Sequence, residues 1–432
     1  MSNLIQQFEE RELVSQIIKQ ENLVKLLKEK SITVYCGFDP SNDSLHVGNL
    51  LLLICLRRFQ LAGHRPLILL GGATGLVGDP SFRKKERKLY SLKKIKNWTK
   101  KIKKQVSLFL DFNCGENSAI IVNNYDWFKN MSILNFLRNI GKYFSVNHMI
   151  NKEAIKKRLN RNNYGITFTE FSYSLFQGYD FVFLNNKYNA ILQIGGSDQW
   201  GNIISGIDLI RKLNGNVAYG LTVPLITKVD GTKFSKSETN ETIWLDPIKT
   251  NSYNFYQFWI NVSDKDVFHF LKIFTFLDLS DIQILKDRMK QKFFSKKKFF
   301  HRKAQYILAK FLTKLVHGKR GLLSAQCITE ILFSENKIQN LTENDFKKCV
   351  KNGISMIVLQ KIQSISLQQA LIMTKLVLSG RQAKDIILAN AISINGKKQN
   401  NKKYIITDDD IKYGHYTLLC RGKKNHRLIY WK

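Results

Sequence analysis

The chain has 432 residues, of which 44% are hydrophobic and 12% aromatic, so it is expected to form two or three globular domains and not a disordered chain. Its formal net charge of +34 favours a polyanionic partner, although free use of lysine throughout the chain explains the same charge. Scattered cysteines argue against a disulfide framework or a zinc site and for a cytoplasmic protein, and no apolar run predicts a membrane partner.

Short apolar runs alternate with helical stretches over the first half of the chain. Residues 1–30 predict a helix followed by an amphipathic lead-in. The alternation that follows predicts a Rossmann-like α/β fold with a parallel sheet, which binds ligands beyond the carboxyl ends of its strands. The expected strands cover 32–38, 65–70, 119–123, 190–194 and 221–226, and the expected helices cover 47–61, 88–110, 131–140, 168–184 and 202–213.

The pattern changes near residue 250, where helical periodicity becomes dominant. Residues 1–249 are therefore assigned to the parallel-sheet domain and 250–334 to an α-helical domain with basic surfaces. Residues 335–365 are weakly patterned and predict a linker with one or two short helices. A small α+β module is expected over 366–432.

The end of the first predicted strand carries the first candidate site. The strand leads through Asp39 to Ser41, and the next helix opens with His46, Gly48 and Asn49. A helix start after a strand and a turn binds anions, because its free N–H groups and its dipole point at the ligand. A solvated histidine at a helix start is the alternative.

A second candidate lies in residues 230–237, which follow the last strand of the first domain. Lys233 and Lys236 stand three apart among small hydroxyl residues, a spacing that suits a clamp on a polyphosphate. A solvated basic loop is the alternative for this segment.

Polar residues on the predicted helix over 168–184 form the third candidate. Tyr173, Gln177 and Asp180 share one helix face among apolar neighbours, where burial without partners would be costly. The alternative is a solvent-exposed polar stripe. Asp198 follows a Gly-Gly turn after the next strand, where it suits a ribose hydroxyl or caps the turn.

Taken in order, the first two segments resemble the HIGH and KMSKS signatures of class I aminoacyl-tRNA synthetases. Asn49 stands where the family usually has histidine, and Phe234 replaces methionine. Four further stretches resemble the bacterial tyrosyl-tRNA synthetases, and residues 366–432 resemble an S-four-type RNA-binding module. These stretches are 70–80, 123–127, 168–173 and 193–202.

The resemblance implies a tyrosine–tRNA ligase that uses ATP with Mg²⁺ to charge tRNA(Tyr), and a homodimer formed around residues 125–165. Ser41, His46, Lys233 and Lys236 are the candidate catalytic residues. Arg83 and Arg87, in the basic run after Asp79, are candidates to reach the pyrophosphate, and a surface charge run is the alternative for them. The implied tyrosine-binding residues are Tyr35 and Asp180 at the phenol, Tyr173, Gln177 and Asp79 at the ammonium, and Gln199 at the carboxylate. A core tyrosine of the first strand is the alternative for Tyr35. The implied ATP-binding residues are Asp39, His46, Gly48, Asn49, Gly196, Asp198, Lys233 and Lys236, with Cys36 at the ribose.

Three other functions compete with this interpretation. A tryptophanyl enzyme shares the signatures but not the Tyr173, Gln177 and Asp180 face. A small-molecule nucleotidyltransferase would not need the helical domain and the RNA-binding module. A non-catalytic RNA-binding protein would not need to keep His46 and the two lysines.

Overall fold

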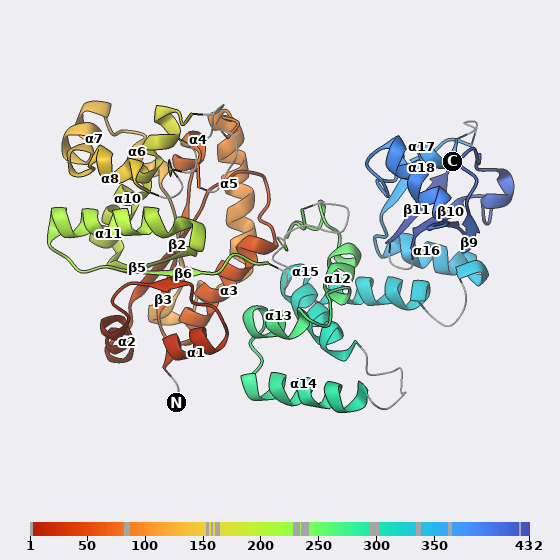
Figure 1. Ribbon diagram of the computed structural model, residues 1–432, viewed down its shortest axis with the longest axis horizontal. Coiled ribbons are helices and arrows are strands. Elements are labelled where there is room, and N and C mark those ends of the chain that lie inside the picture. Colours follow the sequence, from red (N-terminus) through yellow and green to blue (C-terminus); the bar gives the residue numbers. More distant parts are fainter. Residues whose placement is uncertain are drawn as a thin grey trace. The chain divides into compact units, whose positions relative to one another are not determined.

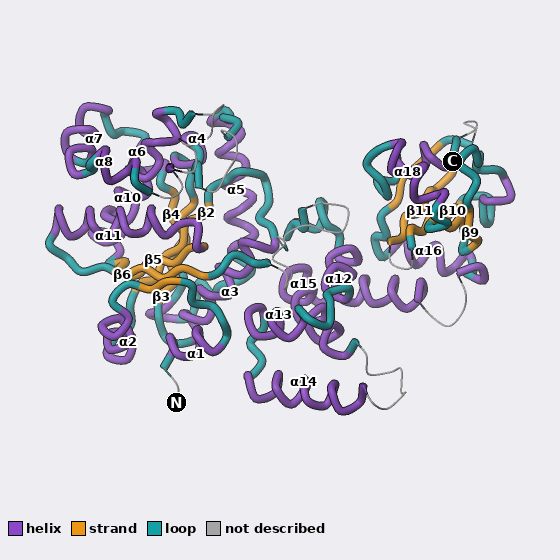
Figure 2. The backbone as a smooth tube through the Cα atoms, viewed as in Figure 1, coloured by secondary structure: helices purple, strands orange, loops and turns teal. Residues whose placement is uncertain are grey.

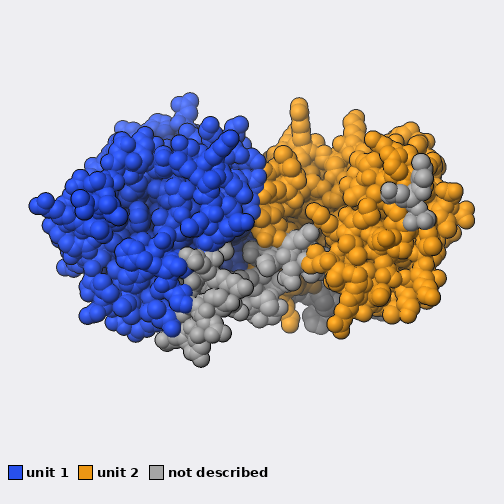
Figure 3. Space-filling view, turned by 90° about the horizontal axis from the view of Figure 1, so that it is seen from above, with its two compact units in different colours: residues 1–233, 272–279 blue, residues 234–271, 280–432 orange. Residues whose placement is uncertain are grey.

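The computed structural model of the chain divides into two compact units. Unit 1 comprises Met1–Lys233 and Lys272–Leu279, and unit 2 comprises Phe234–Leu271 and Ser280–Lys432 (Figure 3). The residues that the structure describes are 3–81, 87–152, 155–156, 159, 165–227, 234, 242–293, 302–333, 338–361, 365–422 and 425–432.

Unit 1 is built on a six-stranded sheet with the strand order β1-β6-β5-β2-β3-β4 (Figures 1 and 2). The strands from β6 to β4 run parallel, and β1 pairs with β6 in the antiparallel direction at one edge. The predicted parallel α/β fold is thus confirmed, with an antiparallel edge strand in addition. The strands are β1 (Gln16–Ile17), β2 (Thr33–Phe38), β3 (Arg65–Leu70), β4 (Ile120–Asn123), β5 (Ala190–Gly196) and β6 (Tyr219–Val223).

Helices cover both faces of this sheet, with α10 and α11 on one side and α3 on the other (Figure 1). A core that includes Tyr35, Leu67, Phe181 and Leu209 joins the strands to α10 and α11. Burial on both faces explains why the strands are apolar runs without alternation. The helices are α1 (Leu4–Glu10), α2 (Gln20–Glu29), α3 (Val47–Leu61), α4 (Thr74–Val77), α5 (Leu92–Val106), α6 (Tyr125–Phe128), α7 (Ile133–Asn139), α8 (Val146–Ile150), α10 (Phe168–Tyr188) and α11 (Trp200–Asn214).

Residues 1–30 form a helix and an amphipathic segment as predicted, α1 and α2, but the prediction missed the strand β1 and the contacts between them. Between α1 and α2, the buried guanidinium of Arg11 donates to the carbonyls of Lys272, Thr275 and Leu277, at 2.6 to 3.4 Å. The short strand β1 then pairs with β6. The partner residues in these contacts are more than two hundred residues away in sequence, so local periodicity could not reveal the contacts.

Other boundaries also differ from the prediction. α5 covers only part of the expected range 88–110. Strand β5 continues through Gly196, where a Gly-Gly turn was predicted, and extends in parallel pairing with β6 up to Val223. The site residues after β5 therefore start from the end of a strand and not from a loop.

Unit 2 combines helices with a second sheet, ordered β7-β11-β10-β8-β9. Strand β7 lies inside the range predicted as a linker, yet it pairs in parallel with β11. Its helices are α12 (Ser252–Ile260), α13 (Val267–Phe274, whose end belongs to unit 1), α14 (Leu279–Phe293), α15 (Lys303–Phe333), α16 (Glu343–Lys351), α17 (Leu367–Met373) and α18 (Gly380–Leu388). Its strands are β7 (Met356–Leu359), β8 (Ile392–Ile394), β9 (Lys397–Gln399), β10 (Tyr416–Arg421) and β11 (Asn425–Trp431).

One hydrophobic core joins the helices of unit 2 to its sheet. Tyr253 of α12 and Leu332 of α15 share it with Phe346 of α16 and Leu428 of β11. The α16 region therefore packs as part of the unit although the sequence predicted a linker there. In the described part of the chain, every helix is too short or too polar to span a bilayer.

Candidate active site

The predicted site residues of unit 1 gather where β2, β3 and β5 end and α10 passes over them. Asp39 follows β2, Asp79 follows α4, and Asp198 follows β5. Tyr173 and Asp180, both on α10, are 6% and 1% exposed, so the solvent-exposed stripe considered from the sequence is excluded for them. Parallel strands explain the gathering, because their carboxyl ends meet at one edge.

The carboxylate of Asp180 is buried and accepts hydrogen bonds from two side chains. Its Oδ2 accepts from Asn124 Nδ2 at 3.0 Å, and its Oδ1 accepts from Trp127 Nε1 at 2.9 Å. Burial raises the pKa of Asp180 well above its ordinary value, and these two donors oppose the shift. The carboxylate keeps lone pairs for a third donor, because each of its oxygens can accept twice.

Asp39 and Tyr173 form a second buried pair next to Asp180. Tyr173 Oη donates to Asp39 Oδ2 at 2.7 Å, and Thr74 Oγ1 donates to Asp39 Oδ1 at 2.6 Å. Burial raises the pKa of both Asp39 and Tyr173. The sequence interpretation placed Asp39 with ATP, and the contact with Tyr173 places it among the residues assigned to the amino acid.

The buried oxygens in this region include two on predicted site residues that have no hydrogen-bond partner among the described residues. They are Tyr35 Oη and Gln177 Oε1. Burial raises the pKa of Tyr35 well above its ordinary value, with the nearby Asp180 adding to the shift. An unpaired buried polar atom costs about 1–3 kcal/mol, which a polar ligand that supplies the missing partner would recover.

The third carboxylate, Asp79, is linked to the residues after β5. Gln199 Nε2 donates to Asp79 Oδ2 at 2.8 Å and to Asp198 Oδ2 at 3.2 Å. Asp198 also folds back over Gly196, where an added Cβ would lie 2.4 Å from its Oδ1. A side chain at position 196 would therefore displace the Asp198 carboxylate from its present position.

His46 and Asn49 cap the N-terminus of α3 reciprocally. Gly48 N donates to His46 Nδ1 at 3.0 Å, and His46 N donates to Asn49 Oδ1 at 3.1 Å. Because Nδ1 accepts, the neutral ring carries its proton on Nε2. The glycine at 48 is needed for this cap, because an added Cβ would lie 2.7 Å from His46 Cε1.

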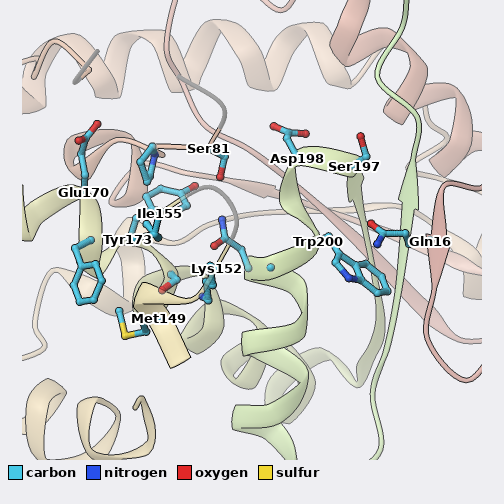
Figure 4. Close-up of a pocket in the computed structure, with 15 residues that line it drawn as sticks. Gln16, Ser81, Met149, Lys152, Ile155, Glu170, Tyr173, Ser197, Asp198 and Trp200 are labelled. Atoms are coloured by element: carbon cyan, nitrogen blue, oxygen red, sulfur yellow. The ribbon is translucent and has the colours of Figure 1, made fainter. Parts of the chain in front are cut away.

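A pocket of about 270 Å³ opens beside these groups, and Lys152 extends into it (Figure 4). In Figure 4, Asp198 and Trp200 lie on one side of the lysine and Tyr173 and Met149 on the other. Lys152 Nζ is buried without a hydrogen-bond partner among the described residues. Burial lowers the pKa of Lys152 to about 8.

The remaining predicted residues are either outside the described part of the chain or contact the cluster only through its backbone. Lys233, Lys236 and Arg83 lie outside the described residues. Ser41 is exposed, and its amide closes a turn on the carbonyl of Asp39. Arg87 Nε donates to the carbonyl of Asp79 at 2.8 Å.

Sequence reasoning missed the residues that hold the carboxylates. Asn124, Trp127 and Thr74 lie in segments that were noted only for their resemblance to the family. The polar Asn-Asn pair at the end of β4 was the available signal, since polar side chains at strand ends approach the ligand. Nothing local marked Lys152.

Comparisons with known proteins show the family of the chain. The family model described as "tRNA synthetases class I (W and Y)" matches residues 27–334, and "Tyrosine--tRNA ligase SYY-like C-terminal domain" matches 345–429. The chain is 55% identical to the tyrosine–tRNA ligase of Citrobacter koseri, over 100% of this chain and 98% of that protein. The tyrosine–tRNA ligase of Salmonella newport is also 55% identical, over 100% and 99% of the two chains.

Solved structures show the same relationship. The C-terminally truncated mitochondrial tyrosyl-tRNA synthetase of Aspergillus nidulans superposes with a TM-score of 0.68 at 28% identity, covering 77% of this chain and 95% of that one. The corresponding enzyme of Coccidioides posadasii superposes with a TM-score of 0.64 at 27% identity, covering 75% of this chain and 91% of that one. The tryptophanyl-tRNA synthetase of Plasmodium falciparum shares the fold, with a TM-score of 0.52 at 16% identity, covering 80% of this chain and 88% of that one.

Proposed function

The chain belongs to the tyrosine-specific class I aminoacyl-tRNA synthetases, and from this membership we propose how its own residues carry out the tyrosine–tRNA ligase reaction. The enzyme activates tyrosine with ATP and then esterifies tRNA(Tyr). Full-length identity of 55% to tyrosine–tRNA ligases carries this conclusion. The proposal concerns which side chains bind each substrate group.

Tyr35 and Asp180 recognise the phenol of tyrosine in this proposal. The phenolic hydroxyl donates to the carboxylate of Asp180, which Asn124 and Trp127 hold in place, and accepts from the unpaired hydroxyl of Tyr35. Both groups are buried, so phenylalanine would leave them without their partner. Tyrosyl-tRNA synthetases are themselves the known example of this effect, since they reject phenylalanine by ~10⁵-fold without editing.

The ammonium and the carboxylate of tyrosine lie nearer the strand ends. Gln177 Oε1, Tyr173 Oη and Asp79 supply acceptors for the ammonium, and Asp39 fixes the orientation of Tyr173 through their 2.7 Å hydrogen bond. Gln199 lies between Asp79 and Asp198, where its amide reaches the substrate carboxylate.

ATP occupies the region between the start of α3 and the end of β5. His46 donates from Nε2 to the phosphates at the positive end of α3, with Ser41 and the helix start at Gly48 and Asn49 beside it. Asp198 accepts from the ribose, with Gly196 and Cys36 alongside, and Lys233 and Lys236 close over the phosphates together with Arg83 and Arg87. Mg²⁺ arrives on the nucleotide and neutralises phosphate charge.

The first step needs no general base, because the tyrosine carboxylate is already an anionic nucleophile. It attacks the α-phosphorus in line, so the P–O bond to pyrophosphate breaks as the new P–O bond forms. Catalysis then depends on positioning and on stabilising the charge that moves onto the leaving pyrophosphate. In the second step a hydroxyl of the terminal tRNA ribose attacks the adenylate carbonyl and releases AMP.

The Lys152 pocket is proposed to receive the 3′ end of the tRNA. It adjoins Asp198, and it holds one buried cation that can pair with a phosphate (Figure 4). Replacing Lys152 with glutamine is expected to raise KM for tRNA(Tyr) about tenfold and to leave tyrosine-dependent pyrophosphate exchange unchanged. Aminoacylation with the exposed Lys156→Gln variant as a control measures the difference.

The same contact predicts a pH dependence. Burial lowers the pKa of Lys152 to about 8, so the positive charge is lost as the pH rises through that value. KM for tRNA(Tyr) should therefore increase between pH 7 and pH 9 in the unmodified protein and stay flat in Lys152→Gln. Parallel curves for the two proteins would remove Lys152 from RNA binding.

Unit 2 is proposed to bind the rest of the tRNA. Residues 250–334 form the α-helical anticodon-binding part, and the S-four-type module of 366–432 contacts the RNA backbone near Arg381 and Lys384 of α18. Residues 335–365 connect the two parts, and 1–249 carry the catalysis. The protein acts in the cytoplasm, consistent with six free cysteines.

A homodimer is proposed to form through α7 and α8 of unit 1. These helices expose Ile133, Leu134 and Val146 by 58–76%, although Phe136 and Met149 anchor them in the core. Exposed apolar side chains in one region mark protein interfaces. Leu134→Glu should convert the dimer to monomers in analytical ultracentrifugation at micromolar concentration, whereas Leu108→Glu, at another exposed leucine, should remain dimeric.

Amino-acid-dependent ATP–pyrophosphate exchange, measured across all twenty amino acids, tests the proposed function. Exchange should depend on tyrosine alone. Exchange with tryptophan would favour the related family, and no exchange at all would favour an RNA-binding protein without catalysis.

A further inference from the structure

Helix α5 of unit 1 presents a face of lysines that the proposed reaction does not use. Seven of its fifteen residues are lysine and none is acidic. The helix packs beside α4 (Figure 1), and its apolar side chains Ile95, Ile102 and Val106 are at most 1% exposed, so the lysines are left on the outside. The exposed lysines are Lys93, Lys94, Lys96, Lys100, Lys101, Lys103 and Lys104.

Most of these lysines have no carboxylate beside them. Lys101 Nζ lies 2.8 Å from Asp43 Oδ2, and within the described part of the chain no carboxylate forms an ion pair with the other six. Other exposed helices balance lysine with acid, as Lys25 pairs with Glu29 on α2. Free use of lysine throughout the chain therefore does not by itself explain the composition of α5.

The charges are unfavourable for the helix that carries them. Lys93 and Lys94 lie in the first turn of α5, where the helix dipole disfavours cations. Lys96 and Lys100 are four residues apart, and Lys104 repeats that spacing, so like charges repel along one side of the helix. A polyanion on this face would relieve both effects, so its binding would gain what the helix alone loses.

The position of α5 brings this face to the nucleotide side of the active site. Gln105 Oε1 accepts from the amide of Leu45 at 2.8 Å, and Leu45 directly precedes His46 at the start of α3. Further up the helix, Lys96 Nζ lies 5.0 Å from the ring centroid of Tyr125, which starts α6 near the carboxyl end of β4. An RNA duplex that delivers its 3′ end to this site can therefore rest its backbone on α5.

We propose that the exposed lysine face of α5 binds the phosphate backbone of the tRNA acceptor stem, next to the 3′ end. This inference rests on the proposed function. Lys93, Lys96, Lys100 and Lys103 recur every three or four residues, so they form one stripe about 15 Å long at 1.5 Å per residue. A B-form duplex carries roughly one negative charge per 1.7 Å of its axis, and a duplex RNA is similarly dense in charge, so a stripe of this length meets several phosphates.

An anionic membrane is the other extended polyanion, and the packing of α5 argues against it. A helix that binds a membrane surface lays its apolar face into the lipid. On α5 that face is already packed into unit 1, with Trp98 9% and Ile102 1% exposed.

Replacing Lys96, Lys100 and Lys103 together with glutamine tests the proposal, since glutamine removes the charge and is still a good helix former. Kd for tRNA(Tyr) should rise about tenfold at 0.1 M salt, and the slope of log Kd against log salt should fall by roughly two to three. An isolated acceptor-stem minihelix should show the same changes. Tyrosine-dependent pyrophosphate exchange should not change, and Tm should stay the same or rise because the repulsion is gone.

A variant with glutamine at Lys25, Lys28 and Lys30 is the matched control, because these lysines of the α2 region are also exposed and the net charge falls equally. Its Kd for tRNA(Tyr) should change by less than about twofold. Equal changes in the two variants would show that only net charge matters and would overturn the proposal. Weaker binding of the whole tRNA with unchanged binding of the minihelix would overturn the assignment to the acceptor stem.

The remaining outcomes are equally decisive. Slower pyrophosphate exchange in the α5 variant would assign the lysines to ATP, and unchanged tRNA binding with a loss of binding to phosphatidylserine vesicles would assign them to a membrane; either would overturn the proposal. Lys100→Gln alone should give about a third of the change in salt slope, which repeats the measurement if the triple variant is poorly folded. Absence of tyrosine-dependent exchange in the unmodified protein would instead overturn the proposed function.

Discussion

Replacing Asp180 with asparagine is expected to lower kcat/KM for tyrosine in pyrophosphate exchange by about 10³-fold, the largest effect of any described residue. The two donors that hold the carboxylate, Asn124 and Trp127, both need an acceptor. An asparagine offers one oxygen and must turn its NH₂ toward the other donor. The phenol then loses its anionic acceptor.

The substrate pair distinguishes recognition from general damage. Phenylalanine has no hydroxyl for Asp180, so its slow activation should change little in Asp180→Asn. The exposed Asp208→Asn variant, on α11, serves as a control and should behave like the unmodified protein. A similar loss for both amino acids would show that Asp180 only supports the fold.

The raised pKa of Asp180 adds a pH test with a definite sign. A folded carboxyl with a raised pKa takes up its proton at a higher pH than the unfolded chain does, so this group favours the folded state as the pH falls. The protonated form is a poor acceptor for the phenol. In the unmodified protein, kcat/KM for tyrosine should therefore fall as the pH is lowered. In Asp180→Asn this acidic decrease in the pH profile should be absent.

The local sequence pattern was sufficient to predict the helices with clear start and stop signals and the strands that are continuous apolar runs. α3 begins at Val47 and ends at Leu61 as expected from its sequence, and β2 and β3 lie where their apolar runs predict them. α10 runs four residues beyond the predicted end, to Tyr188, because Asn189 takes the left-handed conformation with φ of 50° and ends it there. An asparagine at that position is a signal that the sequence contains.

Features set by distant partners could not be predicted in the same way. β7 is a four-residue run in a weakly patterned region, and its pairing with β11 is what makes it a strand. Likewise, the sequence placed Asp180 on a helix over 168–184, where α10 carries it buried, but the side chains that donate to Asp180 are more than fifty residues away in sequence. Which buried oxygens remain unpaired, as at Tyr35 and Gln177, emerges only when all the neighbours are placed.

His46 carries two functions that its sequence motif does not separate, and one substitution should divide them. Its Nδ1 caps α3 by accepting from the Gly48 amide, while its Nε2–H is proposed to donate to the phosphates. Asparagine is as good an N-cap as any residue, so His46→Asn keeps an acceptor for the cap and removes the phosphate donor. The rate of adenylate formation should fall about 10²-fold, with KM for tyrosine and the free energy of unfolding unchanged.

The two related variants complete the test. His46→Ala should show the same loss of rate and, in addition, lose about 1 kcal/mol of stability, because the cap is gone. Asn49→Ala should lose stability with little change in rate, since Asn49 Oδ1 is engaged with the His46 amide.

If Asn49→Ala instead slowed adenylate formation as much as His46→Asn, the cap geometry itself would be the catalytic requirement. If His46→Asn formed the adenylate at the normal rate, the phosphates would have to be held by other groups, and the lysines at 233 and 236 would be the first to examine.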